Sequence, residues 1–510
     1  MLIPHRRYVM KITMLDNEYW WGGCVNLGHK MPFSAESDIE FNLTSGREND
    51  QFAPLLVSSK GRYIWCDGIF DCRIKDGVIE LKTDAAVELR DGFENLRGAY
   101  LAASRAHFPF DGSMPDMLFW SVPQYNTWME LGTEQTTDNI IEYARGIKRS
   151  GLPSGILMID GGWQEDYGVY EYFNQRKIPD PKALVDTLHD MGFTVMVWVS
   201  PIVSSAGTRY KELRDRGYLV TGADGEPVVR KWWSGYSAVL DFSNPDAVAW
   251  MQERLNMLTV NYGVDGFKFD AGDMYFYDDD DVTYGNVSAR EQTALFNALG
   301  EVYRFNEFRA AWNFGGRPIV ARLHDKYHTW DSFGINTLVP HTVLQGLLGY
   351  AYCCPDMVGG GIIGSTDNLD EELFVRWAQA NALMGMMQMS KSPWKILSSD
   401  NVRRVKAAYA LHIKYADYIC SLARNASQSG EPLVRHMCYE FPDEGFETED
   451  GQFMLGSAVL VAPVLKKGER TKTVRLPKGK WRYFDGTVFD GGVSVEVNAD
   501  LDVLPYFEKI

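Results

Sequence analysis

The sequence predicts an α/β protein built on a central (β/α)₈ TIM barrel that is flanked by N-terminal and C-terminal antiparallel β-sandwiches. Apolar runs typical of strands alternate with amphipathic helical stretches through the middle of the chain, and β-rich segments occupy both ends. About eight strand–helix units over roughly 300 residues favour a barrel over an open doubly wound sheet. The first strand is not followed by GxGxxG, and GxxxxGK[ST] does not occur, so nucleotide binding loses its usual support.

The flanking segments predict the domain boundaries. Short alternating runs such as 52–66 and 77–90 are separated by Gly, Asp and Asn turn signals, and similar runs return after about residue 450. We therefore expect an N-terminal sandwich over 1–112, the barrel over 113–427 and a C-terminal sandwich over 428–510. We also expect the WWGG segment (20–23) to reach the rim of the barrel pocket.

The barrel strands are predicted from short apolar runs, each followed by a loop or a helical stretch. Helical stretches at 136–151 and 181–192 begin with capping residues or proline and end at glycine. The expected strands are 117–122, 154–160, 193–201, 264–270, 317–325, 335–340, 349–356 and 384–390.

Composition limits the partners. The formal charge of −17 is not offset by any basic stretch, which argues against nucleic acid and against anionic membranes. Aromatic residues make up 13% of the chain and include 15 Trp, which suits a site that stacks on sugar faces, although Trp is also a common core residue. A carbohydrate is the expected partner, and a homo-oligomer is left open.

The cysteines and the N-terminus indicate the compartment. The seven Cys stand at irregular positions without a CxxC pair or zinc-type spacing, so free thiols in a reducing compartment are the simplest account. The first residues lack an apolar core of signal-peptide length, and the chain has no run of about 18 apolar residues. We expect a cytoplasmic protein without a cofactor or a metal.

The most informative segment is GVDGFKFDAGD (263–273). Its apolar-aromatic strand ends in Asp270, and Asp273 follows one small turn later. A carboxylate at the C-terminal tip of a buried strand is held rigidly and suits a nucleophile, although an isolated FDAG more often caps a helix. Acids, tryptophans and one arginine follow several of the other predicted strands, namely Asp160 with Trp163, Trp198, Arg322 with Asp325, Asp356, and Gln388.

Two ligands could use such a rim of acids. A polyhydroxylated substrate uses carboxylates as hydrogen-bond acceptors, whereas a divalent cation uses them as ligands. The acidic run within 275–283 lacks the Gly and the terminal Glu of a calcium loop. His324 and His328 beside Asp325 lack a fixed third ligand and are better explained as loop residues. A metal-dependent barrel hydrolase and a catalytically dead sugar-binding protein are the competing classes.

The order of these motifs resembles glycoside hydrolase family 31, the retaining α-glycosidases, and is closest to the branch that holds the myogenesis-regulating glycosidase and bacterial α-galactosidases. The resemblance covers almost the whole chain. It rests on WWGG (20–23), LFWSVPQYNTW (118–128), DGGW (160–163), VRKWWSGYSAVLDFSNPDA (229–247), GFKFDAGD (266–273), RLHDKYHTW (322–330), LGYAYCCPDMVGG (348–360) and QFMLGSAVLVAPV (452–464).

This resemblance implies the roles of individual residues. Asp270 matches the nucleophile, and Asp325, five residues before Trp330, matches the general acid/base. Arg322 and Asp356 match two residues of the sugar pocket, and Asp160 resembles the acid after the second strand. The chain departs from the α-glucosidases of the family in its nucleophile motif and at 387–394, where they carry a His. Asp273 stands where the branch more often has Glu.

Elementary chemistry supports the assigned pair. Lys268 lies two positions before Asp270 on the same face of the strand, so it or Arg322 should keep Asp270 ionised. Aromatic side chains and other acids beside Asp325 should raise its pKa, as a proton donor requires.

The branch resemblance implies exo-acting cleavage of terminal α-D-galactosides. Trp232, Trp233 and Asp160 are the candidates for binding the axial 4-hydroxyl, and Trp163 or Trp198 could stack on the sugar. Lys268, Asp273 and Gln388 complete the predicted sugar-binding set. The alternative glycones are glucose and xylose, with sulfoquinovose and N-acetylgalactosamine less favoured.

Overall fold

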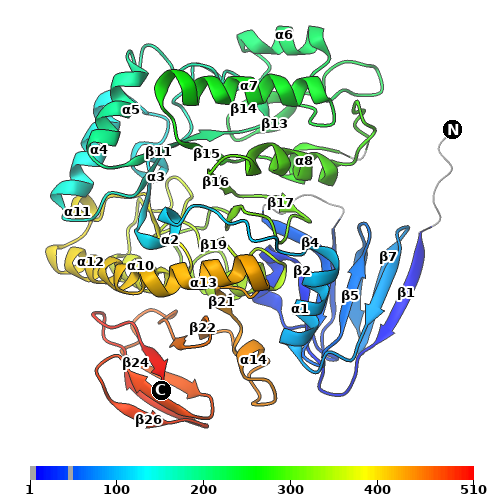
Figure 1. Ribbon diagram of the computed structural model, residues 1–510, viewed down its shortest axis with the longest axis vertical. Helices are drawn as coiled ribbons and strands as arrows, with labels where there is room; N and C mark the ends of the chain where they lie inside the picture. Colours follow the sequence, from blue (N-terminus) through cyan, green and yellow to red (C-terminus); the bar gives the residue numbers. More distant parts are fainter. Residues whose placement is uncertain (1–6, 44–49, 279) are drawn as a thin grey trace.

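A computed structural model describes residues 7–43, 50–278 and 280–510, and its centre is an eight-stranded parallel sheet curved into a barrel (Figure 1). A bridge between Met357 and Gln388 joins the two ends, so the sheet is nearly closed. The predicted fold class is confirmed. In spatial order the strands are β19 (Cys353–Cys354), β18 (Val320–Arg322), β16 (Phe305–Phe308), β15 (Gly266–Phe269), β11 (Thr194–Val199), β10 (Ile156–Ile159), β9 (Gln124–Asn126) and β20 (Gln388–Met389).

Two predicted strands are helical. The run at 117–122 contains helix α2 (Leu118–Ser121), and the first barrel strand is instead β9, immediately after it. The run at 335–340 contains the 3₁₀ turn η3 (Ile335–Thr337) and the start of α9 (Leu338–Leu347). A short apolar run lacks the periodicity that separates a buried helix from a buried strand, which explains both errors.

The sequence prediction also missed β16. Its four residues, FNEF, are all buried, but the polar Asn306 and Glu307 in the middle interrupt the apolar run. Both polar side chains have partners: Asn306 Nδ2 donates to two backbone carbonyls, and Glu307 Oε2 accepts from Gln388 inside the barrel.

Helices cover the outside of the barrel. Helix α7 shows how one such unit delivers β15: Asn244 caps its start, and Gly263 ends it with a φ of 83°. Three residues later Gly266 begins β15, where a Cβ would lie 2.0 Å from the Phe305 carbonyl oxygen, so only glycine fits. The main helices are α4 (Thr137–Arg149), α5 (Pro181–Asp190), α7 (Pro245–Tyr262), α8 (Ala289–Glu301), α10 (Glu371–Ala382), α12 (Ser399–Lys414) and α13 (Ala416–Ser429).

A small antiparallel sheet interrupts the barrel after β11. In sheet order its strands are β12 (Ile202–Ser204), β14 (Gly235–Val239) and β13 (Arg230–Trp232). Helix α6 (Thr208–Arg216) lies between β12 and β13 in the chain. This sheet carries Trp232 and the following Trp233 toward the loop after β15, because Trp232 and Trp233 both pack against Phe276.

The N-terminal region forms two sheets beside the barrel (Figure 1, blue). One contains β1 (Tyr8–Thr13), β7 (Val78–Thr83), β6 (Asp71–Lys75) and β3 (Ile39–Asn42). The other contains β4 (Gln51–Ser58), β5 (Tyr63–Cys66) and β8 (Val87–Arg90), with β2 (Trp20–Cys24) and β17 (Ala311–Trp312) also pairing with β4. Because β17 follows β16 in the chain, this second sheet includes part of the barrel segment. Helix α1 (Leu96–His107) completes the region.

The C-terminal region forms a six-stranded and a two-stranded antiparallel sheet. The six strands are β21 (Val434–Arg435), β22 (Phe453–Leu455), β23 (Val459–Val461), β28 (Tyr506–Lys509), β25 (Lys480–Tyr483) and β26 (Val488–Asp490); the two are β24 (Thr471–Leu476) and β27 (Val493–Asn498). The domain boundaries at 112/113 and 427/428 stay predictions, and residues 1–6 and 44–49 of the first domain lie outside the described residues.

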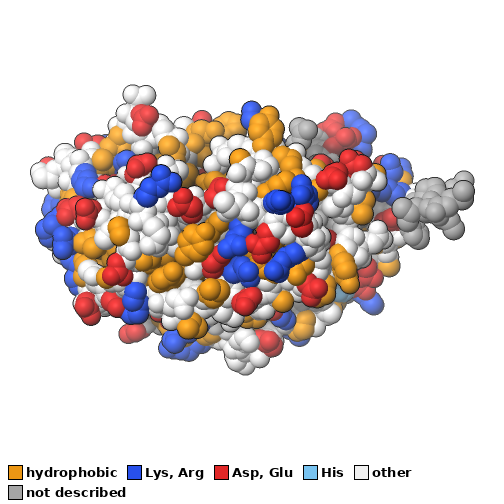
Figure 2. All heavy atoms as spheres, turned by 90° about the horizontal axis from the view of Figure 1, so that it is seen from above, with side chains coloured by type: hydrophobic (Ala, Val, Ile, Leu, Met, Phe, Trp, Pro, Cys, Tyr) orange, Lys and Arg blue, Asp and Glu red, His pale blue; other side chains and the backbone are white. Residues whose placement is uncertain are grey.

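Three further predictions concern the whole chain. All seven cysteines are buried, and none of them forms a disulfide. Within the described part of the chain, no helix has the length and apolar character needed to cross a bilayer. Acidic and basic side chains are interspersed over the face seen in Figure 2, in keeping with the absence of basic stretches in the sequence.

Candidate active site

Asp270 follows β15 directly, and three donors hold its carboxylate. Arg309 Nε donates to Oδ1 at 2.5 Å, and Trp198 Nε1 donates to Oδ2 at 2.8 Å. The backbone N–H of Ala271 also donates to Oδ1, and Ala271 has a φ of 54°. These contacts fix the carboxylate at the C-terminal end of the barrel strand, where the sequence predicted it.

Asp270 is kept ionised. Burial favours the neutral acid, but the charges of Arg309, Lys268 and Arg322 outweigh it and hold the pKa of Asp270 well below its usual range. Lys268 Nζ lies 4.0 Å from Asp270 Oδ2 and donates to Asp160 Oδ2 at 2.7 Å. The predicted link between Lys268 and Asp270 is therefore present, but Arg309 is the closer cation.

Asp325 is the second carboxylate, and it is anchored to Arg322. Arg322 Nη1 donates to Asp325 Oδ1 at 2.8 Å and to Asp356 Oδ1 at 2.9 Å. The Arg322 side chain is fully buried, whereas that of Asp325 is 27% exposed and that of Asp270 is 9% exposed. Asp325 is thus the more accessible of the two acids.

Asp356 and Glu307 complete the surroundings of Arg322. Arg322 Nε lies 3.2 Å from Glu307 Oε1, and the backbone N–H of Lys326 donates to Asp356 Oδ2. Burial raises the pKa of Asp356, with the charge of Asp325 acting in the same direction against Arg322. Burial likewise raises the pKa of Glu307. One arginine therefore holds three acids together in the barrel interior.

Arg309 was not found from the sequence. It follows β16, the strand that the prediction missed, and its guanidinium joins Asp270 to Asp273, with Nη2 donating to Asp273 Oδ2 at 2.8 Å. Burial, together with the charges of Asp270 and Asp50, raises the pKa of Asp273 to about 6. Asp273 Oδ1 is buried and has no hydrogen-bond partner among the described residues.

A cavity of about 370 Å³ opens beside Asp273 and Arg309. Lys231, Trp232, Trp233, Tyr275 and Phe276 complete its lining. Trp232 is almost fully buried, and its Nε1 has no partner in the described part of the chain, whereas Trp233 is 55% exposed. The lining of the cavity therefore includes a buried acceptor on Asp273 and a buried donor on Trp232, both without a described partner, beside the exposed aromatic surface of Trp233.

Other predicted sugar-binding residues lie deeper. Trp163 is fully buried and donates from Nε1 to the Trp198 carbonyl at 2.7 Å, so it supports Trp198 rather than offering a free face. Gln388 is also fully buried and donates to Glu307 Oε2. The WWGG segment is buried as β2, and Trp21 packs against His436 with ring centroids 5.1 Å apart. Sandwich residues Asp50 and Gln51 contact the barrel strand ends instead.

Among the described residues, two groups of side chains have the ligand spacing of a cation site. Ligand atoms of Asp50, His324 and His341 lie within 4.8 Å of one another, but Lys326 Nζ is 3.1 Å from His341 Nδ1 and supplies a competing ammonium group. His328, the other candidate from the sequence, contacts the backbone of Gly359 and Asp370.

The second group lies in the acidic run. It consists of Asp278, Asp280 and Asp281, and Asp279 lies outside the described residues. Arg230 already contacts two of these acids: its Nη2 lies 3.0 Å from Asp278 Oδ2, and it also pairs with Asp281. Both groups therefore fit internal ion-pair and hydrogen-bond networks better than a divalent cation.

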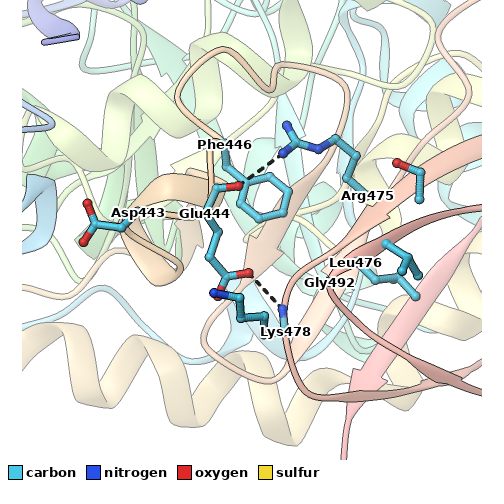
Figure 3. A pocket seen from close by; sticks show the side chains of 9 residues that line it. Asp443, Glu444, Phe446, Arg475, Leu476, Lys478 and Gly492 are labelled. Carbon is cyan, nitrogen blue, oxygen red and sulfur yellow. Dashed lines mark hydrogen bonds between the residues drawn. The ribbon is translucent and has the colours of Figure 1, made fainter.

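A cavity of about 310 Å³ lies in the C-terminal region (Figure 3). The Arg475 guanidinium donates to the Glu444 carbonyl, and the Glu444 carboxylate accepts from the backbone N–H of Lys478. Its one aromatic lining residue, Phe446, is buried under the Arg475 guanidinium, which lies 4.4 Å from the ring centroid. This cavity therefore lacks the free aromatic face and the pair of buried carboxylates found at the barrel.

Comparisons with known proteins identify the family of the chain. Residues 119–422 match the model of the glycosyl hydrolases family 31 TIM-barrel domain, and residues 430–509 match that of the family 31 C-terminal domain. The chain is 31% identical over 420 residues to the myogenesis-regulating glycosidase of Mus musculus, an alignment that covers 79% of this chain and 58% of that protein. It is 27% identical over 398 residues to an α-xylosidase of Lactiplantibacillus pentosus, covering 72% of this chain and 50% of the relative. The chain thus spans little more than half the length of these relatives.

Solved structures share the fold. A family 31 dextranase from Flavobacterium johnsoniae, complexed with glucose, superposes with a TM-score of 0.86 at 20% identity, covering 100% of this chain and 67% of that one. A family 31 α-xylosidase from a soil metagenome, complexed with xylose, gives a TM-score of 0.84 at 21% identity, covering 99% and 79%.

Proposed function

Because the chain belongs to glycoside hydrolase family 31, we propose that it is a retaining exo-α-glycosidase with Asp270 as nucleophile and Asp325 as general acid/base. The observation that carries the proposal is the contrast between the two carboxylates. Asp270 is buried at a strand end and held ionised by Arg309 and Lys268. The side chain of Asp325, which pairs with Arg322, is three times as exposed to solvent as that of Asp270.

The proposed reaction has two displacements. An oxygen of Asp270 attacks the anomeric carbon, the glycosidic C–O bond breaks, and Asp325 transfers its proton to the leaving oxygen. Asp325 then takes a proton from water as the water oxygen attacks the anomeric carbon. The ester bond to Asp270 breaks, and the sugar leaves with its α configuration. Trp198 and Arg309 orient the nucleophile through its two oxygens.

Substitution of the two acids tests this mechanism. Asp270→Ala should lose activity by about four or more orders of magnitude on every substrate, since no covalent intermediate can form. Asp325→Ala should slow sugar leaving groups far more than nitrophenol, which needs little proton assistance. Near-normal turnover by Asp270→Ala, or release of the β-anomer in NMR, would refute the assignment.

We propose terminal α-D-galactosides as the substrates. Support comes from the branch resemblance and from the cavity, where the unpartnered Trp232 Nε1 and Asp273 Oδ1 could bind a hydroxyl whose orientation distinguishes epimers. A site built to hydrogen-bond one hydroxyl rejects the epimer strongly, because its buried polar groups then stay unpaired. Glucosides and xylosides are the alternatives, and an α-xylosidase is among the relatives.

A panel of nitrophenyl α-glycosides decides the substrate. The galactoside should be hydrolysed with the highest kcat/KM, and Trp232→Phe, which keeps the ring but loses the N–H, should reduce that preference. Faster hydrolysis of the glucoside or the xyloside would reject galactose and leave the mechanism standing. Dialysis against a chelator separates this proposal from a metal-dependent hydrolase, since full activity is expected to remain.

A further inference from the structure

Asp50, a residue of the N-terminal sandwich segment, contacts the loop that carries Asp325. Its Oδ1 accepts from the backbone N–H of His324, and its Oδ2 lies 2.6 Å from His324 Nδ1, so one carboxylate binds both the backbone and the ring of one residue. His324 is the residue immediately before Asp325. The Asp50 side chain is fully buried, so the loop is held from inside the protein.

The neighbouring contacts make this a rigid attachment. Gln51 Nε2 donates to the carbonyl of Arg309 and, at 2.9 Å, to that of Arg322, while Gln345 donates to Gln51 Oε1. Gln51 also pairs with Ala311 where β17 joins β4. The start of β4 therefore connects to the ends of the two barrel strands whose arginines contact Asp270 and Asp325.

Charge compensation keeps Asp50 ionised in this position. Burial opposes ionisation, but His324 and Lys326 lower the pKa of Asp50 below its usual value. Lys326 in turn contacts His341, whose pKa burial lowers, and His341 contacts His29 of the sandwich at 3.1 Å. An ionised Asp50 accepts from His324 on both oxygens, so it cannot rotate away without breaking both contacts.

We propose that Asp50 is a positioning residue for the general acid/base: it fixes His324 and thereby the backbone from which Asp325 reaches the leaving oxygen. This inference rests on the role proposed above for Asp325. Arg322 holds the carboxylate of Asp325, and Asp50 holds the preceding residue, so the two contacts together define where the acid sits. Because the Asp50 side chain is buried and both its oxygens are engaged, it acts through His324 and not on the sugar.

The test compares leaving groups in Asp50→Asn, which keeps the shape but loses the charge. The substrates are aryl α-glycosides of the active glycone, spanning leaving-group pKa values from dinitrophenol to phenol, together with a disaccharide. The kcat/KM of Asp50→Asn should fall about 10- to 100-fold for phenol and the disaccharide, as expected of a misplaced acid, and by under about threefold for dinitrophenol. Affinity for a glycone-mimicking inhibitor should stay within about twofold of wild type.

Tyr350→Phe is the matched control. Tyr350 Oη donates to the Phe52 carbonyl on the same sandwich–barrel contact, so its loss disturbs that contact without touching His324. This variant should keep the wild-type dependence on leaving group. If Asp50→Asn does not fold, His324→Ala removes the ring contact alone and should steepen the dependence in the same direction.

The outcomes separate the two proposals. An equal loss on all leaving groups, or a weaker inhibitor affinity with an unchanged slope, would overturn the role of Asp50. If Asp325→Ala steepens the dependence but neither Asp50→Asn nor His324→Ala does, only this inference fails. If Asp325→Ala itself leaves the slope unchanged, the acid/base assignment fails and this inference fails with it.

Discussion

At the end of β16, Arg309 serves two acids that stand three residues apart on the loop after β15. Its Nε contacts Asp270 and its Nη2 contacts Asp273, so one buried guanidinium compensates two buried carboxylates. Burial opposes the ionisation of both acids, but Asp270 also has the charges of Lys268 and Arg322 beside it, so its pKa is lowered whereas that of Asp273 is raised. Asp270 therefore stays an anion, whereas Asp273 changes its protonation state near pH 6.

Asp273 gives a pH-dependent stability. Its pKa is about 6 in the folded protein against 3.8 for the unperturbed group, so the folded state holds this proton more tightly. The resulting stabilisation is present below the unfolded pKa and is lost as the pH rises through about 6, a total of about 3 kcal/mol. Asp273→Asn cannot ionise, so its free energy of unfolding relative to wild type should rise by about 1 kcal/mol between pH 5 and pH 7. Urea unfolding at both pH values measures this, and a difference that does not change with pH contradicts it.

Gly361 leaves room for the acid/base. A Cβ on this residue would lie 2.7 Å from Asp325 Oδ1 and equally close to Met357 Cε, while the Gly361 carbonyl accepts from Trp128 Nε1 at 2.9 Å. The backbone is therefore held in place, and Asp325 has to move. Gly361→Ala should lower kcat at least about tenfold on sugar leaving groups, since small displacements of a catalytic group are costly.

The control for this glycine lies away from the site. Gly222→Ala places its Cβ 3.1 Å from Asp224 Oδ1 and should leave kcat unchanged. Wild-type turnover by Gly361→Ala would show that Asp325 has more freedom than its contact with Arg322 implies.

At the scale of elements, the sequence predicted what local patterns encode. Strand β15 and the acid at its end were correctly located, because GFKF is a fully buried strand with two aromatic residues that starts three residues after a helix-ending glycine. Strand β16 was missed because the polar Asn306 and the inward-facing Glu307 stand in its middle, and Arg309 was missed with it. A polar residue facing a barrel interior reduces the only signal that a single sequence offers for a buried strand.

The attachment of the sandwich could not be predicted in the same way. Asp50 and His324 are 274 positions apart, and Gln51 and Arg322 are 271 apart. Neither Asp50 nor Gln51 belongs to a local pattern that distinguishes it from an ordinary surface residue. Such contacts depend on how whole layers meet, so the part of the candidate site supplied by the sandwich becomes visible only in three dimensions.

At the scale of the whole molecule, Arg376 attaches the C-terminal region to the barrel. It lies fully buried in α10, and the C-terminal sheets lie next to α10, α12 and α13 in Figure 1. Its guanidinium donates to the carbonyls of Ala499 (2.6 Å), Glu469 (3.1 Å), Val503 (3.1 Å) and Asp500 (3.3 Å). Burial, with the charge of Arg470, lowers the pKa of Arg376 to about 10, so it is still charged at neutral pH.

Removing this cation should loosen the whole C-terminal region. Arg376→Ala removes four hydrogen bonds from a charged donor, although the Asp500 carbonyl still accepts from Val503 N–H and that of Glu469 from Arg470. Because hydrogen bonds to charged groups are strong, the free energy of unfolding should fall by at least about 3 kcal/mol. Arg470→Ala is the control: Arg470 pairs with Glu372 at the same junction but is 42% exposed, so its loss should cost under about 1 kcal/mol. In calorimetry, Arg376→Ala should also show a second unfolding transition at a lower temperature. Hydrogen exchange should show that the segment that unfolds in this transition is β21–β28. Equal losses in the two variants would mean that the C-terminal sheets are held by their apolar contacts, and that the buried arginine is not what joins them to the barrel.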